Sequence, residues 1–298
     1  ISSFNNFEPR VSISYMLDTK TSLKASYNRM AQYLHLLSNT ASPTPLDVWM
    51  PSGKYIKPQL LDQYAIGYFK SIKNGDYSIE TEVFYKDIQN RIDYINGANL
   101  VANDQIETVI LNGKARAYGL EILFKKNEGK LKGWVAYTLS RSEQLTAGRT
   151  PEETGINSGE WYNTPYNKTH DFSINASYEL NQKWKFNTNF VFQTGQPTNY
   201  PVGQYEIQGL NVPIYDDNSR NSDRLPSYHR LDISATLTPR KNNKRRWKGE
   251  WVFGIYNLYA RQNAASLNFT QNSETLRNEA TQTSIFGMVP SVTYNFKF

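Results

Sequence analysis

The sequence predicts an all-β protein, more narrowly an antiparallel transmembrane β-barrel, on three observations. Apolar and polar residues alternate with period two through most of the 298 residues, as they do in strands whose successive side chains point to opposite faces. Short turns alternate with long polar loops along the chain. The segments between them reach or exceed the about 9–11 residues with which a tilted strand crosses a bilayer.

Eleven segments carry the alternating pattern. In one of them, Phe172, Ile174 and Tyr178 fall on one face, whereas Asp171 and Asn175 fall on the other. Each segment therefore has an apolar and a polar face, as a strand between lipid and a polar interior requires. The expected strands, in order, are 7–17, 21–35, 60–71, 76–95, 105–126, 130–145, 168–180, 183–194, 228–239, 247–260 and 284–298.

Two kinds of connection join these strands. Tight turns are expected where Asn, Asp and Gly gather, because these residues tolerate turn conformations. The turns lie at 18–20, 73–76, 127–129 and 181–182, with a looser one at 239–246. The long polar loops lie at 36–59, 96–104, 146–166, 195–226 and 261–282. This alternation is typical of outer-membrane barrels, whereas a soluble β-sandwich, the alternative, has shorter strands.

Composition narrows the class of protein. A mean hydropathy of −0.64 and the lack of any apolar run of about 18 residues exclude transmembrane helices. Aromatic residues make up 14% of the chain, which argues against disorder. The absence of cysteine excludes a disulfide scaffold and a cysteine zinc site. A net charge of +6 is weak evidence for a nucleic-acid partner.

The odd strand number bears on domain organisation. Bacterial single-chain barrels have an even number of strands, and unpaired backbone groups in hydrocarbon cost several kcal/mol each. We therefore expect residues 1–298 to be the C-terminal part of a 22-stranded barrel, the size of the plugged outer-membrane transporters. The plug domain and the N-terminal half of the barrel would precede it.

Several motifs resemble one family. The segment Asn112–Ile122 has the form N-G-x-A-x-x-x-G-x-E, which is similar to the motif at the start of a strand in TonB-dependent receptors. Further similar stretches are Pro165–Phe172, Phe192–Pro197, Ser227–Asp232 and Ile255–Tyr259. The C-terminal Pro290–Phe298, which ends on an aromatic residue, looks like an outer-membrane sorting signal. Together they resemble receptors of the Bacteroidota type.

The resemblance implies a function. Such a receptor would take up a nutrient (an iron chelate, a glycan or a peptide) across the bacterial outer membrane, driven by TonB–ExbB–ExbD through the plug. It implies long extracellular loops, a periplasmic C-terminus, contact with outer-membrane lipids and, as an open question, a surface lipoprotein partner. The alternatives are a family member that serves as a scaffold in an outer-membrane complex, or an energy-independent channel or adhesin barrel.

Two sets of residues are candidates for the site. Loop aromatics can stack on sugars and organic ligands, although they can equally pack within loops or form the interfacial girdle. These candidates are Trp49, Tyr55, Trp161, Tyr162, Tyr200, Tyr205 and Tyr215. Polar strand residues are expected to line the lumen, where they could also satisfy one another or the plug. These are Glu80, Glu82, Asp171, Asn187, Arg230 and Asp232.

Other chemistry has little support in the sequence. The motifs G-x-S-x-G, G-x-G-x-x-G and the P-loop are absent, and the three histidines lack metal-ligand spacing, so we expect no enzyme, no cofactor and no metal. A calcium site at Asp216, Asp217 and Asp223 is the weak exception. The basic run 240–248 is interpreted as a turn near lipid phosphates, and no nucleic-acid partner is expected.

Overall fold

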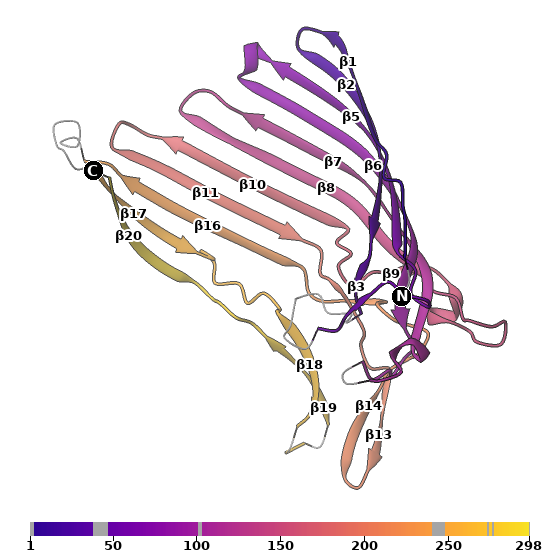
Figure 1. Cartoon of the computed structure of the whole chain (residues 1–298). Coiled ribbons are helices and arrows are strands. Elements are labelled where there is room, and N and C mark those ends of the chain that lie inside the picture. The colour runs from indigo at the N-terminus through magenta and orange to yellow at the C-terminus, as the bar shows by residue number, and fades with distance from the viewer. Residues whose placement is uncertain are drawn as a thin grey trace.

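The computed structural model describes residues 3–37, 47–100, 103–239, 248–272, 274–275 and 277–297. Within them, one antiparallel sheet runs the length of the chain, and each long strand pairs with the next (Figure 1). The strands of its main path are β1 (Arg10–Asp18), β2 (Thr21–Gln32), β5 (Gln59–Ile72), β6 (Tyr77–Tyr94), β7 (Ile110–Lys126), β8 (Leu131–Leu145), β10 (His170–Glu179), β11 (Trp184–Gln193), β16 (Tyr228–Leu237), β17 (Lys248–Tyr256) and β20 (Val289–Lys297). The predicted all-β antiparallel fold and its eleven strands are confirmed.

The sheet is strongly curved. In Figure 1, β1, β2 and β5 are seen nearly edge-on, whereas β10, β11 and β16 are seen face-on. The long connections gather at one end of the strands and the tight turns lie at the other. We call these the loop end and the turn end. No helix among the described residues is long and apolar enough to cross a membrane.

The tight turns form where the sequence predicts them, and the reasons are local. Asp18 Oδ1 accepts a hydrogen bond from the Lys20 amide at 2.6 Å, and Asn181 Oδ1 accepts one from the Lys183 amide at 2.8 Å. Both are Asx-type turns. The turn at 73–76 places Asn74 in the left-handed region, at φ 55°, which asparagine tolerates well. The expected turn at 239–246 lies outside the described residues from position 240 onward.

The long loops are more regular than the sequence predicts. They contain the short hairpins β3–β4 (Leu34–Leu36 and Trp49–Pro51), β13–β14 (Gly203–Ile207 and Leu210–Ile214) and β18–β19 (Ser266–Gln271 and Asn278–Thr283), and the pair β12–β15 (Pro197–Thr198 and Asp223–Arg224). In β13–β14 the two turn residues, Gln208 and Gly209, both have positive φ, as in the type I′ turns that suit hairpins. These strands were missed because they are only two to six residues long and lie in stretches rich in Asn, Gly, Pro and Ser, which indicate loops.

Three strand boundaries differ from the expected ones by four residues or more. The strand expected from 105 begins at Ile110, because residues 106–108 form the 3₁₀ turn η2 (Ile106–Thr108). The strand expected to 260 ends at Tyr256, since Asn257 has a φ of 52°. The last strand begins at Val289 rather than 284.

Strand register gives the sheet one continuous apolar face. Ala25, Ile66, Val83 and Leu120 lie opposite one another across β2, β5, β6 and β7. Farther along, Phe190 pairs with Leu231. Nearer the loop end, a row of tyrosines crosses the same four strands, formed by Tyr27, Tyr64, Tyr85 and Tyr118. Aromatic rows at the margin of an apolar band are typical of the girdle of a membrane barrel.

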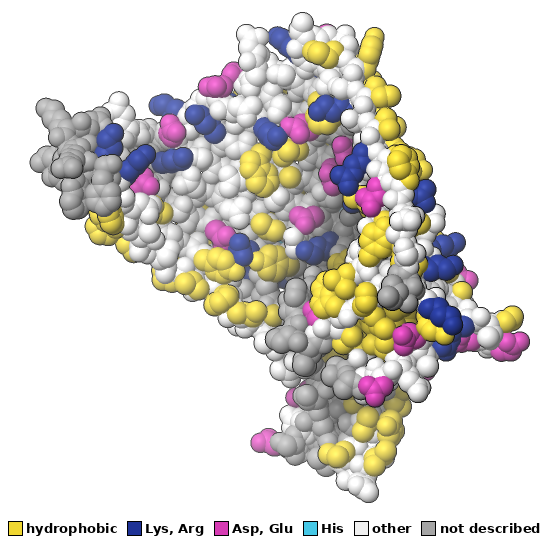
Figure 2. Space-filling model, in the orientation of Figure 1, with side chains coloured by type: hydrophobic (Ala, Val, Ile, Leu, Met, Phe, Trp, Pro, Cys, Tyr) yellow, Lys and Arg dark blue, Asp and Glu magenta, His cyan; other side chains and the backbone are white. Residues whose placement is uncertain are grey.

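The opposite face is polar, and Figure 2 shows its scattered Lys, Arg, Asp and Glu side chains. This face continues from strand to strand, because Glu121 pairs with Thr138 and Thr138 pairs with Asp171. The register places all six predicted lumen residues on it: Glu80, Glu82, Asp171, Asn187, Arg230 and Asp232. The pairing register of the strands therefore separates these charged and polar side chains from the apolar ones.

The buried side chains concentrate at the loop end. One apolar cluster joins Leu37, Ile56, Ile92, Ile106 and Ile110, and a second joins Leu111, Ile156 and Tyr162. The loops therefore pack against the ends of β6 and β7, and this packing supports the site described next.

Candidate functional site

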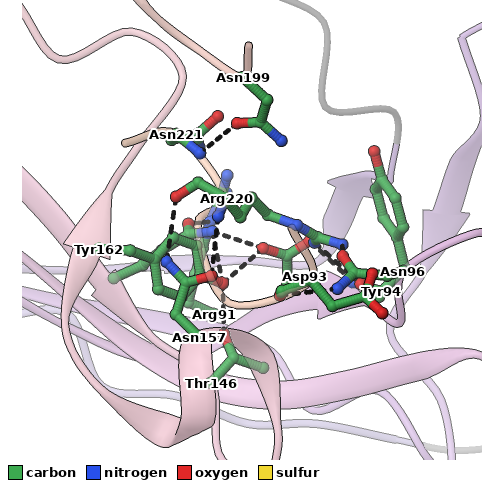
Figure 3. A network of polar contacts seen from close by, with 12 residues as sticks. Arg91, Asp93, Tyr94, Asn96, Thr146, Asn157, Tyr162, Asn199, Arg220 and Asn221 are labelled. Atoms are coloured by element: carbon green, nitrogen blue, oxygen red, sulfur yellow. Dashed lines mark hydrogen bonds and ion pairs between the residues drawn. The ribbon is translucent and has the colours of Figure 1, made fainter. Parts of the chain in front are cut away.

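The loop end holds a buried polar network centred on Asp93, at the end of β6 (Figure 3). Its Oδ1 accepts a hydrogen bond at 2.7 Å from Nη1 of Arg220, which lies in the connection between β11 and β16. Its Oδ2 accepts from Tyr162 Oη and from Gln144 Nε2, both at 2.6 Å. Asp93 therefore fastens strand β8, the short strand β9 (Tyr162–Asn163) and a long loop to the end of β6.

A β-bulge aims Asp93 into this network. The pairing of β6 with β7 shifts between Gln89 and Arg91, and the intervening Asn90 has a φ of 56°. Before the bulge, the even-numbered residues of β6, such as Lys86, face the polar side. After the bulge, the odd-numbered residues, such as Asp93, face it. An extra residue reverses which face the following side chains point to. Asn90 is held in place by donating from Nδ2 to the Pro58 carbonyl at 2.8 Å.

Arg220 is buried and fully engaged, with 8% of its surface exposed. Besides Asp93, its Nη1 donates to the Tyr94 carbonyl at 2.9 Å, and its Nη2 donates to Asn96 Oδ1. Its guanidinium carbon lies 5.0 Å from the centre of the Tyr94 ring. The positive charge is therefore neutralised and stacked on an aromatic face.

Reciprocal asparagine pairs tie two loops together around Arg220. Asn157 accepts from the Arg220 amide at 2.9 Å and donates to its carbonyl at 3.1 Å. Asn221 donates to the Asn163 carbonyl at 2.8 Å, and Asn163 donates back to the Asn221 carbonyl at 3.2 Å. Each amide satisfies backbone groups of the other loop, as buried polar groups require.

Tyr162 lies below these pairs and is 4% exposed. Its hydroxyl also contacts Thr146 Oγ1 at 2.9 Å and accepts from Gln144 Nε2 at 3.0 Å. Burial, together with the Asp93 carboxylate, raises the pKa of the Tyr162 phenol well above its usual range. Tyr162 therefore stays protonated and acts as a hydrogen-bond donor to Asp93.

Above the network lies a polar pocket of about 530 Å³, a volume within the range of small-molecule sites. Its wall is built by three separate connections and by the hairpin β18–β19. Residues from its different sides are Asn96, Gln196, Asn199, Tyr215, Arg220 and Phe269. Figure 3 shows Asn199 and Asn221 on the side of Arg220 away from Thr146.

A close backbone approach shapes this pocket. A Cβ on Gly195 would lie 1.6 Å from the Leu225 carbonyl oxygen, so only glycine fits there. Next to it, the Leu225 amide donates to the Gln196 carbonyl at 2.9 Å. This explains why the stretch Phe192–Pro197 has a glycine at its centre.

The seven predicted aromatic residues lie in different places, and only some of them are at the pocket. Tyr215 lines the pocket. Tyr200 lies near it: its hydroxyl donates to the Arg224 carbonyl at 2.6 Å, and its ring lies 5.6 Å from that of Phe269, a lining residue. Tyr162 is buried in the supporting network, so its ring is not presented to a ligand.

The other four aromatics lie elsewhere. Trp161 packs 4.1 Å from the guanidinium of Arg116, which is on the apolar side of β7. Trp49 is in β4, Tyr55 lies beyond it, and Tyr205 is in the hairpin β13–β14, and all three are exposed.

The predicted lumen residues have neighbours on the sheet. Glu80 pairs with Lys125 at 2.6 Å, and Arg230 pairs with Asp232 at 3.0 Å. Asp171 accepts from Gln193 at 2.8 Å. These contacts agree with the alternative that lumen side chains satisfy one another.

The weak calcium candidate gains no support. Among the residues that the structure describes, no group of three His, Asp or Glu side chains could hold a metal ion. Asp216 Oδ1 instead accepts from the Asn218 amide, and Asp223 Oδ2 accepts from the Tyr200 amide. The first contact belongs to a local turn, and the second joins residues that are 23 positions apart in the chain.

The sequence missed the residues that build the site: Asp93, Arg220, Asn96, Asn157 and Asn221. Asp93 falls within an expected strand, and Arg220 lies 127 residues farther along the chain. The one available signal was the density of asparagine in the loops, which are too polar for an apolar core.

An eleven-stranded wall with one apolar and one polar face, bearing a pocket at its loop end, defines a segment of an outer-membrane receptor barrel. The family model described as TonB dependent receptor-like, beta-barrel matches residues 1–258. The chain therefore belongs to this family. The likeness to receptors of the Bacteroidota type stays a prediction.

Solved structures share the fold. The ferripyoverdine receptor of Pseudomonas aeruginosa is 13% identical with a TM-score of 0.62, over 99% of this chain and 33% of the receptor. The ferric-catecholate import receptor Fiu of E. coli K12 is 15% identical with a TM-score of 0.58, over 96% of this chain and 34% of Fiu. BauA, the ferric preacinetobactin receptor of Acinetobacter baumannii, is 14% identical with a TM-score of 0.54, over 97% and 36%.

The chain thus spans about a third of the length of these receptors. No curated protein matches it in a sequence comparison.

Proposed function

We propose that residues 1–298 form the C-terminal half of the barrel of a transporter that takes up a nutrient across the outer membrane. The observation that carries the proposal is the separation of an apolar from a polar face across the eleven strands, in a chain of the receptor family. A sheet that meets lipid on one side and a polar lumen on the other needs this separation. The remaining strands and a plug would come from the part of the protein before residue 1.

The loop end is the extracellular end in this proposal, and the C-terminus lies in the periplasm. Short periplasmic turns and long extracellular loops are the rule in such barrels. The pocket above Asp93 then faces the medium, where it would meet the nutrient first. Energy would come from TonB–ExbB–ExbD acting on the plug. A surface lipoprotein that covers the loops stays an expectation.

Growth of the native bacterium tests the proposal. A strain that lacks the full-length gene is compared with a strain that lacks TonB, on a panel of single carbon and iron sources. We expect one source on which both strains fail to grow. On that source, returning the full-length gene should restore growth of the strain that lacks it. Growth that needs the gene but not TonB would indicate an energy-independent channel. If no source depends on the gene while lipoproteins co-purify with the protein, the scaffold alternative holds.

A further inference from the structure

The pocket above Asp93 offers neutral hydrogen-bonding groups. Within the described residues, the side chains of Gln196 and Thr198, the Nδ2 of Asn199 and the hydroxyl of Tyr215 line it without a hydrogen-bond partner. By contrast, Asn199 Oδ1 is occupied by the Asn221 amide. Amides and hydroxyls of this kind both donate and accept. The free groups are therefore suited to a ligand that is itself rich in groups that donate and accept.

The pocket offers no free charge. Arg220 is the one charged residue among the described residues that line it, and its guanidinium is committed to Asp93, the Tyr94 carbonyl and Asn96. An anionic ligand that loses its water in such a site needs an uncompensated cation or several charge-assisted donors. Iron chelates built on carboxylates or catecholates carry such negative charge, and no uncommitted cation among the described lining residues balances it.

The pocket also offers apolar surfaces. Tyr215 is exposed, and Phe269 is held by the edge of Tyr200 with ring centres 5.6 Å apart. Pro165, Pro197 and Leu267 complete this part of the wall. Flat apolar surfaces beside free amides match a molecule with apolar ring faces and hydroxylated edges. A peptide would also use the amides, but its charged termini and side chains would again find no counter-charge.

We infer that this pocket binds a neutral oligosaccharide rather than an anionic iron chelate. The inference rests on the proposed function, because it names the substrate class of the same site. The pocket would select its ligand by matched hydrogen bonds and ring contacts. The buried Asp93–Arg220 pair sets the shape of the pocket, and its charges are spent on each other.

Binding to the purified full-length protein tests the inference apart from transport. The probes are neutral hexasaccharides of glucose, xylose, mannose, galactose and arabinose, together with ferric citrate as the anionic chelate, all measured by calorimetry. The variants are Asn199→Ala and Tyr215→Ala. The matched control is Tyr205→Ala, which removes an exposed tyrosine of the hairpin β13–β14 that does not line the pocket.

We expect one hexasaccharide series to bind and ferric citrate not to compete with it. Each pocket variant should weaken binding about tenfold, which corresponds to one lost hydrogen bond or ring contact, and Tyr205→Ala should leave it unchanged. The inference is overturned if no hexasaccharide binds, if ferric citrate occupies the site, or if the two pocket variants bind like the control. Because calorimetry needs no TonB, a failure here is distinct from a failure of the growth test.

Discussion

Asp93 and Arg220 lie 127 residues apart in the sequence, yet their side chains meet at 2.7 Å in a buried ion pair at the loop end of the barrel wall. Asp93 belongs to the rigid sheet and Arg220 to the longest connection. Because the same carboxylate also accepts from Gln144 and Tyr162, one residue joins three segments. The pocket above it therefore has a fixed floor.

Asp93→Asn tests this role. The substitution leaves the buried Arg220 without a counter-charge, and loss of one partner of a buried pair costs about 3–5 kcal/mol. We expect hydrogen exchange to speed up in residues 157–163 and 218–224 of the full-length protein. The control is Glu279→Gln in the exposed hairpin β18–β19, which should leave both segments unchanged. Equal protection in Asp93→Asn and wild type would show that the ion pair does not hold the loops.

Tyr162→Phe removes one hydroxyl from the same network. Thr146, Gln144 and Asp93 then each lose a buried partner, and we expect local stability to fall by about 1–3 kcal/mol. The exchange of residues 144–146 reports this change. Tyr205→Phe, on an exposed tyrosine, is the matched control and should have no effect. If hydrogen exchange in Tyr162→Phe is no faster than in the wild type, the assignment of Tyr162 to the supporting network is contradicted.

Gly195→Ala should prevent correct closure of the pocket wall. The new Cβ would lie 1.6 Å from the Leu225 carbonyl oxygen, whereas a Cβ on Gly53 would meet nothing within 4 Å. We expect Gly195→Ala to expose the connection 195–226 to limited proteolysis and Gly53→Ala to behave like the wild type. Resistance of both variants to the protease would mean that the backbone approach is looser than the structure has it.

The loop residues Arg149 and Glu153 give a pH dependence with a definite sign. Hydrogen bonds from the Arg149 side chain and amide lower the pKa of Glu153 from 4.5 to about 2. A depressed pKa in the folded state stabilises the contact above pH 4.5, and this contribution is lost as the pH falls toward 2.

Exchange at residues 149–153, corrected for the intrinsic rate, should therefore stay slow from pH 7 to 4.5 and rise below it. Glu153→Gln should remove the pH dependence. A wild-type profile that is flat down to pH 2 would contradict the assigned contact.

The two faces of β20 differ in their tolerance of charge. Val292 continues the apolar face from Phe253, whereas its neighbour Thr293 continues the polar face from Val252. A lysine on the lipid side costs about 2–4 kcal/mol near the bilayer midplane. We expect Val292→Lys to lower the yield of folded barrel in the outer membrane and Thr293→Lys to preserve it. The reverse order would place lipid on the other face.

The wall was predictable from the sequence because its information is local. Alternation along Phe172, Ile174 and Tyr178 and the Asx turn at Asp18 depend on residues next to one another. The site was not predictable in this way. Asp93 reaches the polar side only because of the bulge at Asn90, and the alternating pattern gives no sign of this bulge. Arg220 contacts Asp93 only when the fold has brought β6, β8 and the loop after β11 side by side. The hairpins in the loops were missed for a different reason, since their strands are short and lie among turn-forming residues.

The proposal that this wall is half of a plugged barrel is tested most directly by the intact mass and N-terminal sequence of the protein from its native outer membrane. The chain has a mass of 34.3 kDa and spans 33% of the ferripyoverdine receptor. We predict one polypeptide of roughly three times this mass that begins with a plug and contains eleven further strands, to reach the 22 of the plugged transporters. A mature protein of 34.3 kDa would contradict the account, because eleven strands would then have to close by oligomerisation.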